Sequence, residues 1–243
     1  MHYLKLRRSR TILGAFLVFS LLITAFPTID LHVSRLFFHG RAFRHDAWQK
    51  LVHDGLGYLL WISLSAVLAI YAHNRLLQRN LCSIDGKRVL YLLFVLIVGA
   101  GLIVNTGFKD NFGRARPRDI VEFGGTKQFT PAYVVSQECS TNCSFSSGDA
   151  AGGFFSLALA LALTRRRSIF VAAVAVGVVV SVARIASGAH FFSDTVVSFF
   201  VMLIAADVSY FYIVRAHDPV RIPHAPARPA CEVVPVSAIR PEN

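Results

Sequence analysis

The stretch LLFVLIVGAGLIVNTGFKDNFGRARPRD, Leu92–Asp119, determines the fold class and the topology of this chain. Its first part is an apolar run of the kind that spans a membrane, since about 20 residues of helix cross a hydrocarbon core of about 30 Å. Its second part places four cations directly behind that run: Lys109, Arg114, Arg116 and Arg118. Lys and Arg beside a membrane span normally mark the cytoplasmic side. The side on which these four cations lie therefore has to be established from the rest of the chain.

The composition of the whole chain is that of a polytopic membrane protein. Of its 243 residues, 54% are hydrophobic and only 16% are charged, which is too apolar for an ordinary soluble domain. The formal net charge of +11 fits cytoplasmic loops rich in Lys and Arg and is compatible with an anionic lipid or phosphate partner. Nucleic acid is not an expected partner, because the basic residues do not gather on a soluble module. The oligomeric state cannot be predicted.

Apolar segments predict an all-α bundle of six membrane-spanning helices, at Thr11–Ile29, Gly55–Ala72, Val89–Gly107, Ser147–Thr164, Ile169–Ile185 and Thr195–Val214. The basic N-terminus, the basic loop after the second segment, the arginines after the fourth and the tail all fall on one side. The positive-inside rule makes that side cytoplasmic and places both termini there. We expect residues 1–214 to form the membrane domain, with a motif-bearing core at 89–214. The Pro-rich residues 215–243 are expected to be a disordered tail.

In this topology the four cations lie outside, against the rule that governs the other loops, and two further polar clusters lie with them. Ser146, Ser147 and Gly148, ahead of the fourth span, either present backbone N–H groups to an anion or form a plain helix N-cap. The third cluster, ARIASGAHFFSDT, spans Ala183–Thr195 and links the fifth and sixth spans.

Arg184, His190 and Asp194 are the ionisable residues of this third cluster. His190 and Asp194, four residues apart, are expected to share a helix face, so that the carboxylate holds one ring nitrogen and leaves the other free. Cations, backbone amides and a nitrogen nucleophile on one face are the set that phosphoryl transfer requires. No group of carboxylates or histidines indicates a metal site, and no cofactor is expected.

These residues resemble the type 2 phosphatidic acid phosphatase family. Its first motif is a Lys, six residues and Arg-Pro, which Lys109 and Arg116-Pro117 match. Its third motif is Ser-Arg, five residues, His, three residues and Asp, which Arg184, His190 and Asp194 match, although Ala183 replaces the Ser. The second motif, Pro-Ser-Gly-His, is reduced to Ser147-Gly148-Asp149. The resemblance covers roughly Val89 to Val214.

The resemblance implies a metal-independent phosphatase in which His190 attacks phosphorus to form a phospho-histidine, supported by Asp194. The phosphate would be bound by Lys109, Arg116, Arg184, Ser147 and Gly148. Arg114 is an additional candidate ligand. Asp149 takes the place of the His that donates a proton to the leaving oxygen. An aspartate is a poor acid unless its surroundings favour the protonated form, or unless the leaving group departs without help.

The expected substrate is a lipid phosphate in the outer leaflet of a bacterial inner membrane, with the site facing the periplasm. Family members with altered second motifs are similar to lipid A phosphatases, which remove the phosphate at the 1 or 4′ position. Lipid A is therefore the first choice of substrate. Undecaprenyl diphosphate or phosphatidylglycerophosphate phosphatase is the alternative, and a non-catalytic lipid-phosphate binding or transport protein is the third. Hydrolysis and transfer to a second lipid are not distinguished.

Two features of the outer segments complete the sequence predictions. Leu31–Gly55 mixes Arg and Lys with Phe and Trp, which is typical of an amphipathic stretch in the headgroup layer that either gathers an anionic lipid or anchors the protein. Cys139 and Cys143 would face an oxidising compartment, and their spacing permits a disulfide.

Overall fold

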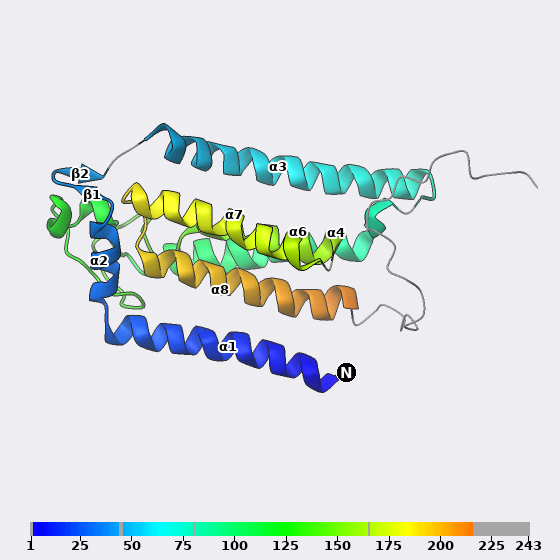
Figure 1. The fold of residues 1–243 in the computed structure, drawn as a ribbon, viewed down its shortest axis with the longest axis horizontal. Coiled ribbons are helices and arrows are strands. Elements are labelled where there is room, and N and C mark those ends of the chain that lie inside the picture. Colours follow the sequence, from blue (N-terminus) through cyan, green and yellow to red (C-terminus); the bar gives the residue numbers. More distant parts are fainter. Residues whose placement is uncertain (1, 44–45, 80, 165, 216–243) are drawn as a thin grey trace, which may run out of the picture.

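The computed structural model describes residues 2–43, 46–79, 81–164 and 166–215 as a bundle of roughly parallel helices (Figure 1). The helices are α1 (His2–Ala25), α2 (Thr28–Arg35), α3 (Ala47–Leu76), α4 (Gly86–Phe94), α5 (Gly148–Phe154), α6 (Ser156–Leu163), α7 (Arg167–Ala186) and α8 (Phe192–Ser209). α4 and α8 continue as π-helical segments, Val95–Lys109 and Tyr210–Arg215, and short 3₁₀ turns occupy Leu81–Ser83, Pro117–Asp119 and Val121–Phe123. Strands β1 (Phe38–His39) and β2 (Ala42–Phe43) form an antiparallel hairpin. The tail predicted at 215–243 lies outside the described residues except for Arg215, which ends a π-helical segment.

The mostly helical architecture agrees with the predicted class, and four helices are long and apolar enough to cross a membrane: Ala47–Leu76, Gly86–Lys109, Arg167–Ala186 and Phe192–Arg215. The first predicted span does not run on to Ile29, because the chain bends by 86° between Ser9–Ala25 and Thr28–Arg35. The fourth predicted span is a shorter apolar helix, Gly148–Leu163. Six crossings and the cytoplasmic position of the termini therefore stay predictions.

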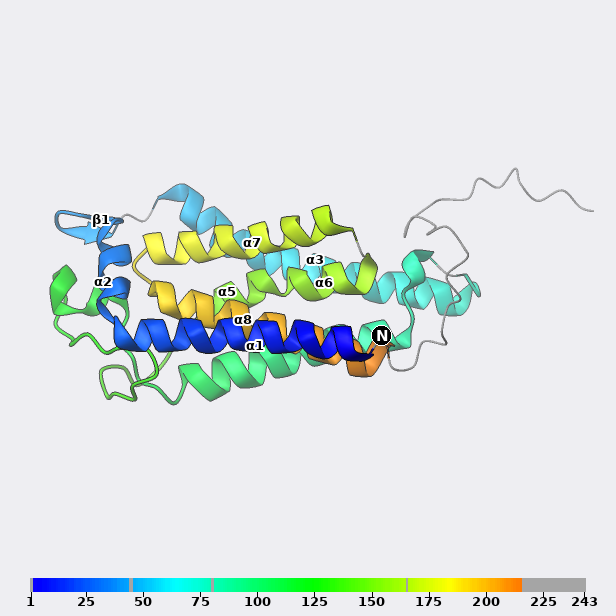
Figure 2. The same ribbon diagram turned by 60° about the horizontal axis from the view of Figure 1, so that its bottom comes forward.

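One end of the bundle, which we call the loop end, carries α2, the β1–β2 hairpin, the loop at 110–147 and the turn at 187–191 (Figures 1 and 2). The segment predicted to be one amphipathic stretch, Leu31–Gly55, here contains part of α2, the hairpin and the start of α3. Rings of Phe38, Phe43 and Phe123 pack with centroids 5.2–5.4 Å apart. Phe43 also lies so close to Gly188 (φ +64°) that a Cβ there would approach its ring to 2.5 Å. The hairpin thereby covers the turn that leads into α8.

Glycines allow α5 and α7 to pack closely in the middle of the bundle. A Cβ at Gly153 would lie 3.2 Å from the Cα of Gly177, and a Cβ at Gly177 would lie 2.0 Å from the ring of Phe154. Small residues at helix interfaces let backbones approach in a membrane protein, where packing replaces the hydrophobic effect as the driving force. Phe154 also packs edge-on against Phe199 of α8, with centroids 5.0 Å apart. This contact joins α5, α7 and α8 into one core beneath the loop end.

Gly177→Ala is expected to lower the free energy of unfolding by about 1–3 kcal/mol, because the added methyl group overlaps the Phe154 ring and overpacking costs that much. Gly57→Ala on the exposed face of α3, where a Cβ meets nothing within 4 Å, is the matched control and should be neutral or stabilising. Denaturant titration in detergent measures both. Equal stability of the two variants would contradict the close α5–α7 contact.

Candidate active site

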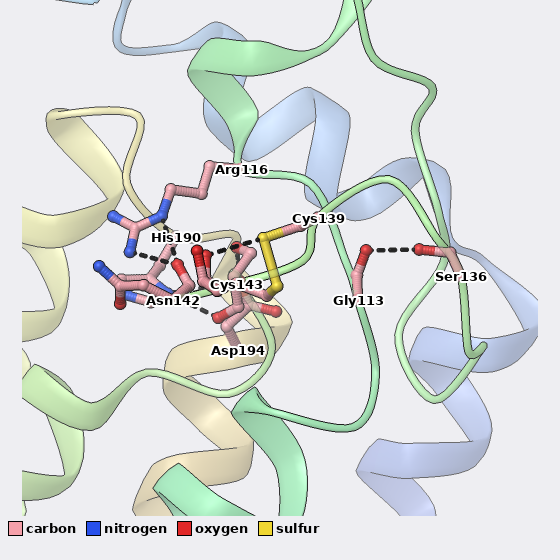
Figure 3. The surroundings of a disulfide bond; sticks show 10 residues. Gly113, Arg116, Ser136, Cys139, Asn142, Cys143, His190 and Asp194 are labelled. Atoms are coloured by element: carbon pink, nitrogen blue, oxygen red, sulfur yellow. Dashed lines mark hydrogen bonds and ion pairs between the residues drawn. A yellow bond between two sulfur atoms is a disulfide. The ribbon is translucent and has the colours of Figure 1, made fainter.

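The three polar clusters come together at the loop end, and backbone hydrogen bonds join them. The N–H of Arg118, in the first cluster, donates to the carbonyl of Gly188 in the third over 3.1 Å. The N–H of Ser147, in the second cluster, donates to the carbonyl of Asp194 over 3.4 Å. Figure 3 shows Arg116, His190 and Asp194 side by side although they come from different parts of the chain.

His190 is buried at the centre of this group, in the turn that precedes α8. Its Nδ1 lies 2.8 Å from the carbonyl of Ser144 and 3.7 Å from Oδ2 of Asp194. A carbonyl only accepts, so Nδ1 carries the proton and the neutral ring keeps its lone pair on Nε2. Burial lowers the pKa of His190, against the opposing effect of Asp194. The ring is therefore held in the neutral form that a nucleophile needs.

The predicted shared helix face of His190 and Asp194 is wrong, because α8 begins only at Phe192. Asp194 lies in the first turn, where its Oδ2 accepts from the N–H of Phe191 over 2.8 Å and from the hydroxyl of Ser144 over 2.5 Å. The carboxylate thus fixes the start of α8 and the segment whose carbonyl orients His190. It supports the histidine from 3.7 Å and not through a direct hydrogen bond.

Arg114, an additional candidate for phosphate binding, lies fully buried in a network of protein acceptors. Its Nη1 donates to Oδ1 of Asp194 (2.6 Å) and to Oγ of Ser193 (2.9 Å), and its Nη2 donates to Oδ2 of Asp30 (2.8 Å). Its Nε donates to the carbonyl of Thr130 over 2.7 Å. Four of the five N–H directions of a guanidinium are therefore committed to the protein. This geometry makes Arg114 a support of Asp194, and a phosphate would have to displace a buried partner to reach it.

Arg116 presents its guanidinium differently. Both its Nε and its Nη2 donate to one acceptor, the carbonyl of Asn142, at 3.2 and 2.7 Å. The second terminal nitrogen, Nη1, has no such bond among the described residues. Burial lowers the pKa of Arg116, and the positive charges of Arg118 and Arg184 lower it further. Arg116 is thus a cation among other cations, and the N–H groups of its Nη1 are available to bind an anion.

Lys109 and Arg184 complete this cationic group. Lys109 is half-buried, and within the part of the chain that the structure describes its ammonium makes no hydrogen bond or ion pair. Arg184 is 16% exposed, and its Nε lies 2.7 Å from Oδ2 of Asp149 without the alignment of a hydrogen bond. Among the described residues, Asp149 is the carboxylate that forms an ion pair with this group, while Asp110 and Asp119 act on Lys109 and Arg116 from a greater distance. A cluster of cations of this kind suits an anion such as phosphate.

The second cluster forms the helix N-cap that was one of its two predicted roles, and anion binding stays a prediction. The hydroxyl of Ser147 accepts from the N–H of Ala150 over 3.2 Å as the N-cap of α5, and its own proton is still available to an anion. Gly148 has room for no side chain, since a Cβ would lie 2.6 Å from Oδ1 of Asn105. The hydroxyl of Ser146 is buried and unpartnered among the described residues, which makes Ser146 a further polar group at this position.

Asp149 lies between two basic side chains. Its Oδ2 is 2.7 Å from Nε of Arg184 and 3.5 Å from Nδ1 of His53, a residue near the start of α3. The carboxylate is 27% exposed and the His53 side chain 48% exposed. Asp149 is thus placed beside the cations, as the sequence predicted, but its second partner is an imidazole that no motif contains.

A disulfide between Cys139 and Cys143, with a Cα–Cα distance of 5.6 Å, confirms the predicted pairing. The loop that it closes carries Asn142 in the left-handed region (φ +52°), and the carbonyl of Asn142 is the acceptor for Arg116. Ser144, whose carbonyl accepts from His190, follows directly. Figure 3 shows this loop beside Arg116 and His190.

Sequence reasoning missed four residues of the site: Asp30, His53, Asn142 and Ser144. Asp30 could have been identified from the sequence, because an acidic residue at the end of an apolar span is unusual. Asn142 and Ser144 act through backbone carbonyls, which side-chain motifs do not show. Within residues 2–43, 46–79, 81–164 and 166–215, no group of three or more His, Cys, Asp or Glu side chains is arranged to hold a metal ion.

Arg114→Leu should lower the free energy of unfolding by about 3–5 kcal/mol, because it leaves the carboxylates of Asp30 and Asp194 buried without their cation. The control is Arg118→Leu. Arg118 is 41% exposed and its Nε lies 3.9 Å from Asp119, so its loss should cost less than about 1 kcal/mol. Denaturant titration in detergent checks the pair, and a small effect at Arg114 would refute the supporting role.

Comparison with known proteins agrees with this geometry. Residues 88–218 match the family model described as PAP2 superfamily. The chain is 32% identical to the lipid A 4′-phosphatase of Francisella tularensis subsp. novicida, over 79% of this chain and 90% of that protein. It is 30% identical to the lipid A 4′-phosphatase of Rhizobium etli, over 82% of this chain and 87% of that protein. No solved structure shows a significant match. With its motif residues gathered in one site and this match over more than half its length, the chain belongs to the PAP2 superfamily and is a phosphoric monoester hydrolase.

Proposed function

We propose that this hydrolase removes the 4′-phosphate of lipid A at the periplasmic face of the bacterial inner membrane. The observation that carries the chemistry is the orientation of His190, whose Nδ1 is committed to the Ser144 carbonyl and whose Nε2 is left as the nucleophile. The substrate and position are inferred from the lipid A 4′-phosphatases that the chain resembles over most of their length.

In the proposed reaction, the Nε2 lone pair of His190 attacks phosphorus in line with the sugar oxygen. Lys109, Arg116 and Arg184 bind the equatorial oxygens, where charge accumulates in the transition state. The P–O bond breaks and phosphate remains on Nε2, while Nδ1–H of the new phospho-imidazolium stays bonded to Ser144 and faces Asp194 at 3.7 Å. Water then attacks phosphorus and restores His190.

The distribution of charge supports a periplasmic site. At the end of the bundle opposite the loop end, basic residues gather at the ends of α3, α4 and α7: Arg75, Arg79, Lys87, Arg88, Arg166 and Arg167. Such residues favour the cytoplasmic side, which leaves the loop end outside.

Expression of the chain in a bacterial host that makes bis-phosphorylated lipid A should yield lipid A that has lost one phosphate. Mass spectrometry measures the loss, and fragmentation should assign it to the 4′ position. His190→Ala should abolish it, since removal of a nucleophile costs roughly 10⁴–10⁶-fold, whereas His39→Ala on the exposed hairpin should not. Unchanged lipid A in the presence of inserted wild-type protein would exclude this substrate, and loss of the 1-phosphate would exclude the position.

Replacing both Cys139 and Cys143 with Ser should lower kcat/KM by roughly 10–100-fold, because the carbonyls that orient Arg116 and His190 lose their constraint and small misplacements at a reacting centre are costly. Steady-state kinetics of the wild type with and without reductant should reproduce the effect. Kinetics that are indifferent to both treatments would show that the loop is ordered without the disulfide.

A further inference from the structure

A single imidazole near the start of α3 lies beside the position where the family motif has its proton-donating histidine. Nδ1 of His53 is 3.5 Å from Oδ2 of Asp149. His53 lies outside the residues that match the family model, 88–218, and no motif includes it. Asp149 itself is paired with Arg184 at 2.7 Å. Asp149 thus lies between a guanidinium and an imidazole, and of these groups the imidazole has the chemistry of the motif's proton donor.

The packing of α3 on α5 fixes this contact. A Cβ at Gly152 of α5 would lie 3.2 Å from Cδ1 of Leu60 and 3.4 Å from Cδ2 of Leu56. His53 precedes Leu56 by three residues, and Asp149 precedes Gly152 by three residues. Both helices begin at the loop end (Figure 2), so the same step along each helix reaches the same level of the bundle. The absence of a side chain at Gly152 therefore brings the two ionisable groups together.

Other histidines at the loop end that the structure describes are differently bound. Nδ1 of His32 pairs with the carbonyl of Thr28 over 2.7 Å, and Nδ1 of His39 pairs with the carbonyl of Phe37 over 3.0 Å. Both are exposed, and neither faces a carboxylate of the site. His190 is committed as the nucleophile in the proposed function.

We propose that His53 is the general acid of this enzyme and that Asp149 is its positioning residue. This inference rests on the proposed phospho-histidine chemistry. Asp149 accepts from Nδ1–H of the imidazolium and leaves Nε2–H to donate to the departing sugar oxygen. The family's second-motif imidazole is thus supplied here from another helix.

The proton and electron balance closes over both half-reactions. As Nε2 of His190 bonds to phosphorus, the P–O electron pair leaves with the sugar oxygen, which takes the Nε2 proton of His53. Neutral His53 then removes a proton from the attacking water. The P–N pair returns to His190, and phosphate leaves while His53 is again an imidazolium. With its side chain 48% exposed, His53 is also able to exchange protons with water between turnovers.

Three cations act on the Asp149 side of this pair: Arg184 from α7, Lys109 from the π-helical segment and Arg116 from the loop. Since the proposal requires His53 in its acid form, activity should fall as pH rises. That fall is the alkaline limb of the kcat profile.

The test compares His53→Gln with His39→Gln, using phosphate release from detergent-dispersed lipid A and from dioleoyl phosphatidic acid across pH. His53→Gln should lose about 10²–10⁴-fold in kcat together with the alkaline limb, whereas His39→Gln should match the wild type. Asp149→Asn, which keeps His53 but removes its charged partner, should lower kcat and still show the alkaline limb. An unchanged alkaline limb in His53→Gln would overturn the proposal, whatever the size of the loss.

Rescue separates a proton donor from a merely structural residue. In the His53→Gln background, Asp149→His restores an imidazole at the family's usual position and should recover at least about 10-fold in kcat. A double variant no better than His53→Gln would count against the proposal.

The two substrates separate this proposal from the proposed function. If the wild type releases phosphate from phosphatidic acid but not from lipid A, lipid A is excluded as the substrate, and the His53 comparison is still made on phosphatidic acid.

Discussion

The buried ion pairs of Arg114 with Asp30 and Asp194 are the interaction on which the rest of the loop end depends. They join the loop after the third predicted span to α2 and to α8, three elements distant in the sequence. Two carboxylates around one cation are stable in a buried position only because hydroxyl and amide donors satisfy the remaining lone pairs. The N–H and hydroxyl of Ser193 donate to Asp30 at 2.8 and 2.6 Å. Such a network specifies one arrangement of the three elements, because any shift leaves a buried charge unpaired.

From this network the orientation of His190, the proposed nucleophile, follows in two steps. Asp194 binds the hydroxyl of Ser144, and the carbonyl of the same residue binds Nδ1 of His190. The carboxylate therefore acts on the histidine through a backbone segment. That segment also leads back to Asn142, the acceptor for Arg116. One short loop thus orients both His190 and Arg116, and the disulfide lies within that loop.

The sequence predicted the residues of the site better than their contacts. Spacing and the family resemblance predicted that Lys109, Arg116, Arg184 and His190 lie together, and the structure brings the four to one end of the bundle. It misjudged the relation of His190 to Asp194, since four residues suggest a helical turn whereas the helix begins between them. It grouped Arg114 with the phosphate ligands because a buried network leaves no periodic pattern. The contact of His53 with Asp149 depends on a missing side chain at Gly152, and such a packing contact between distant helices is invisible in one sequence.

The charge balance gives a physical reason for a carboxylate at position 149. A histidine there, once protonated, would add a positive charge beside Lys109, Arg116 and Arg184 and would be opposed by all three. Asp149 instead forms an ion pair with Arg184 at 2.7 Å and so offsets part of the positive charge. It also lies 3.5 Å from Nδ1 of the half-exposed His53 and gives that imidazole a carboxylate partner. Moving the imidazole to α3 separates it from the cations by one carboxylate, so the same substitution that removes the family's proton donor creates the environment in which another can work.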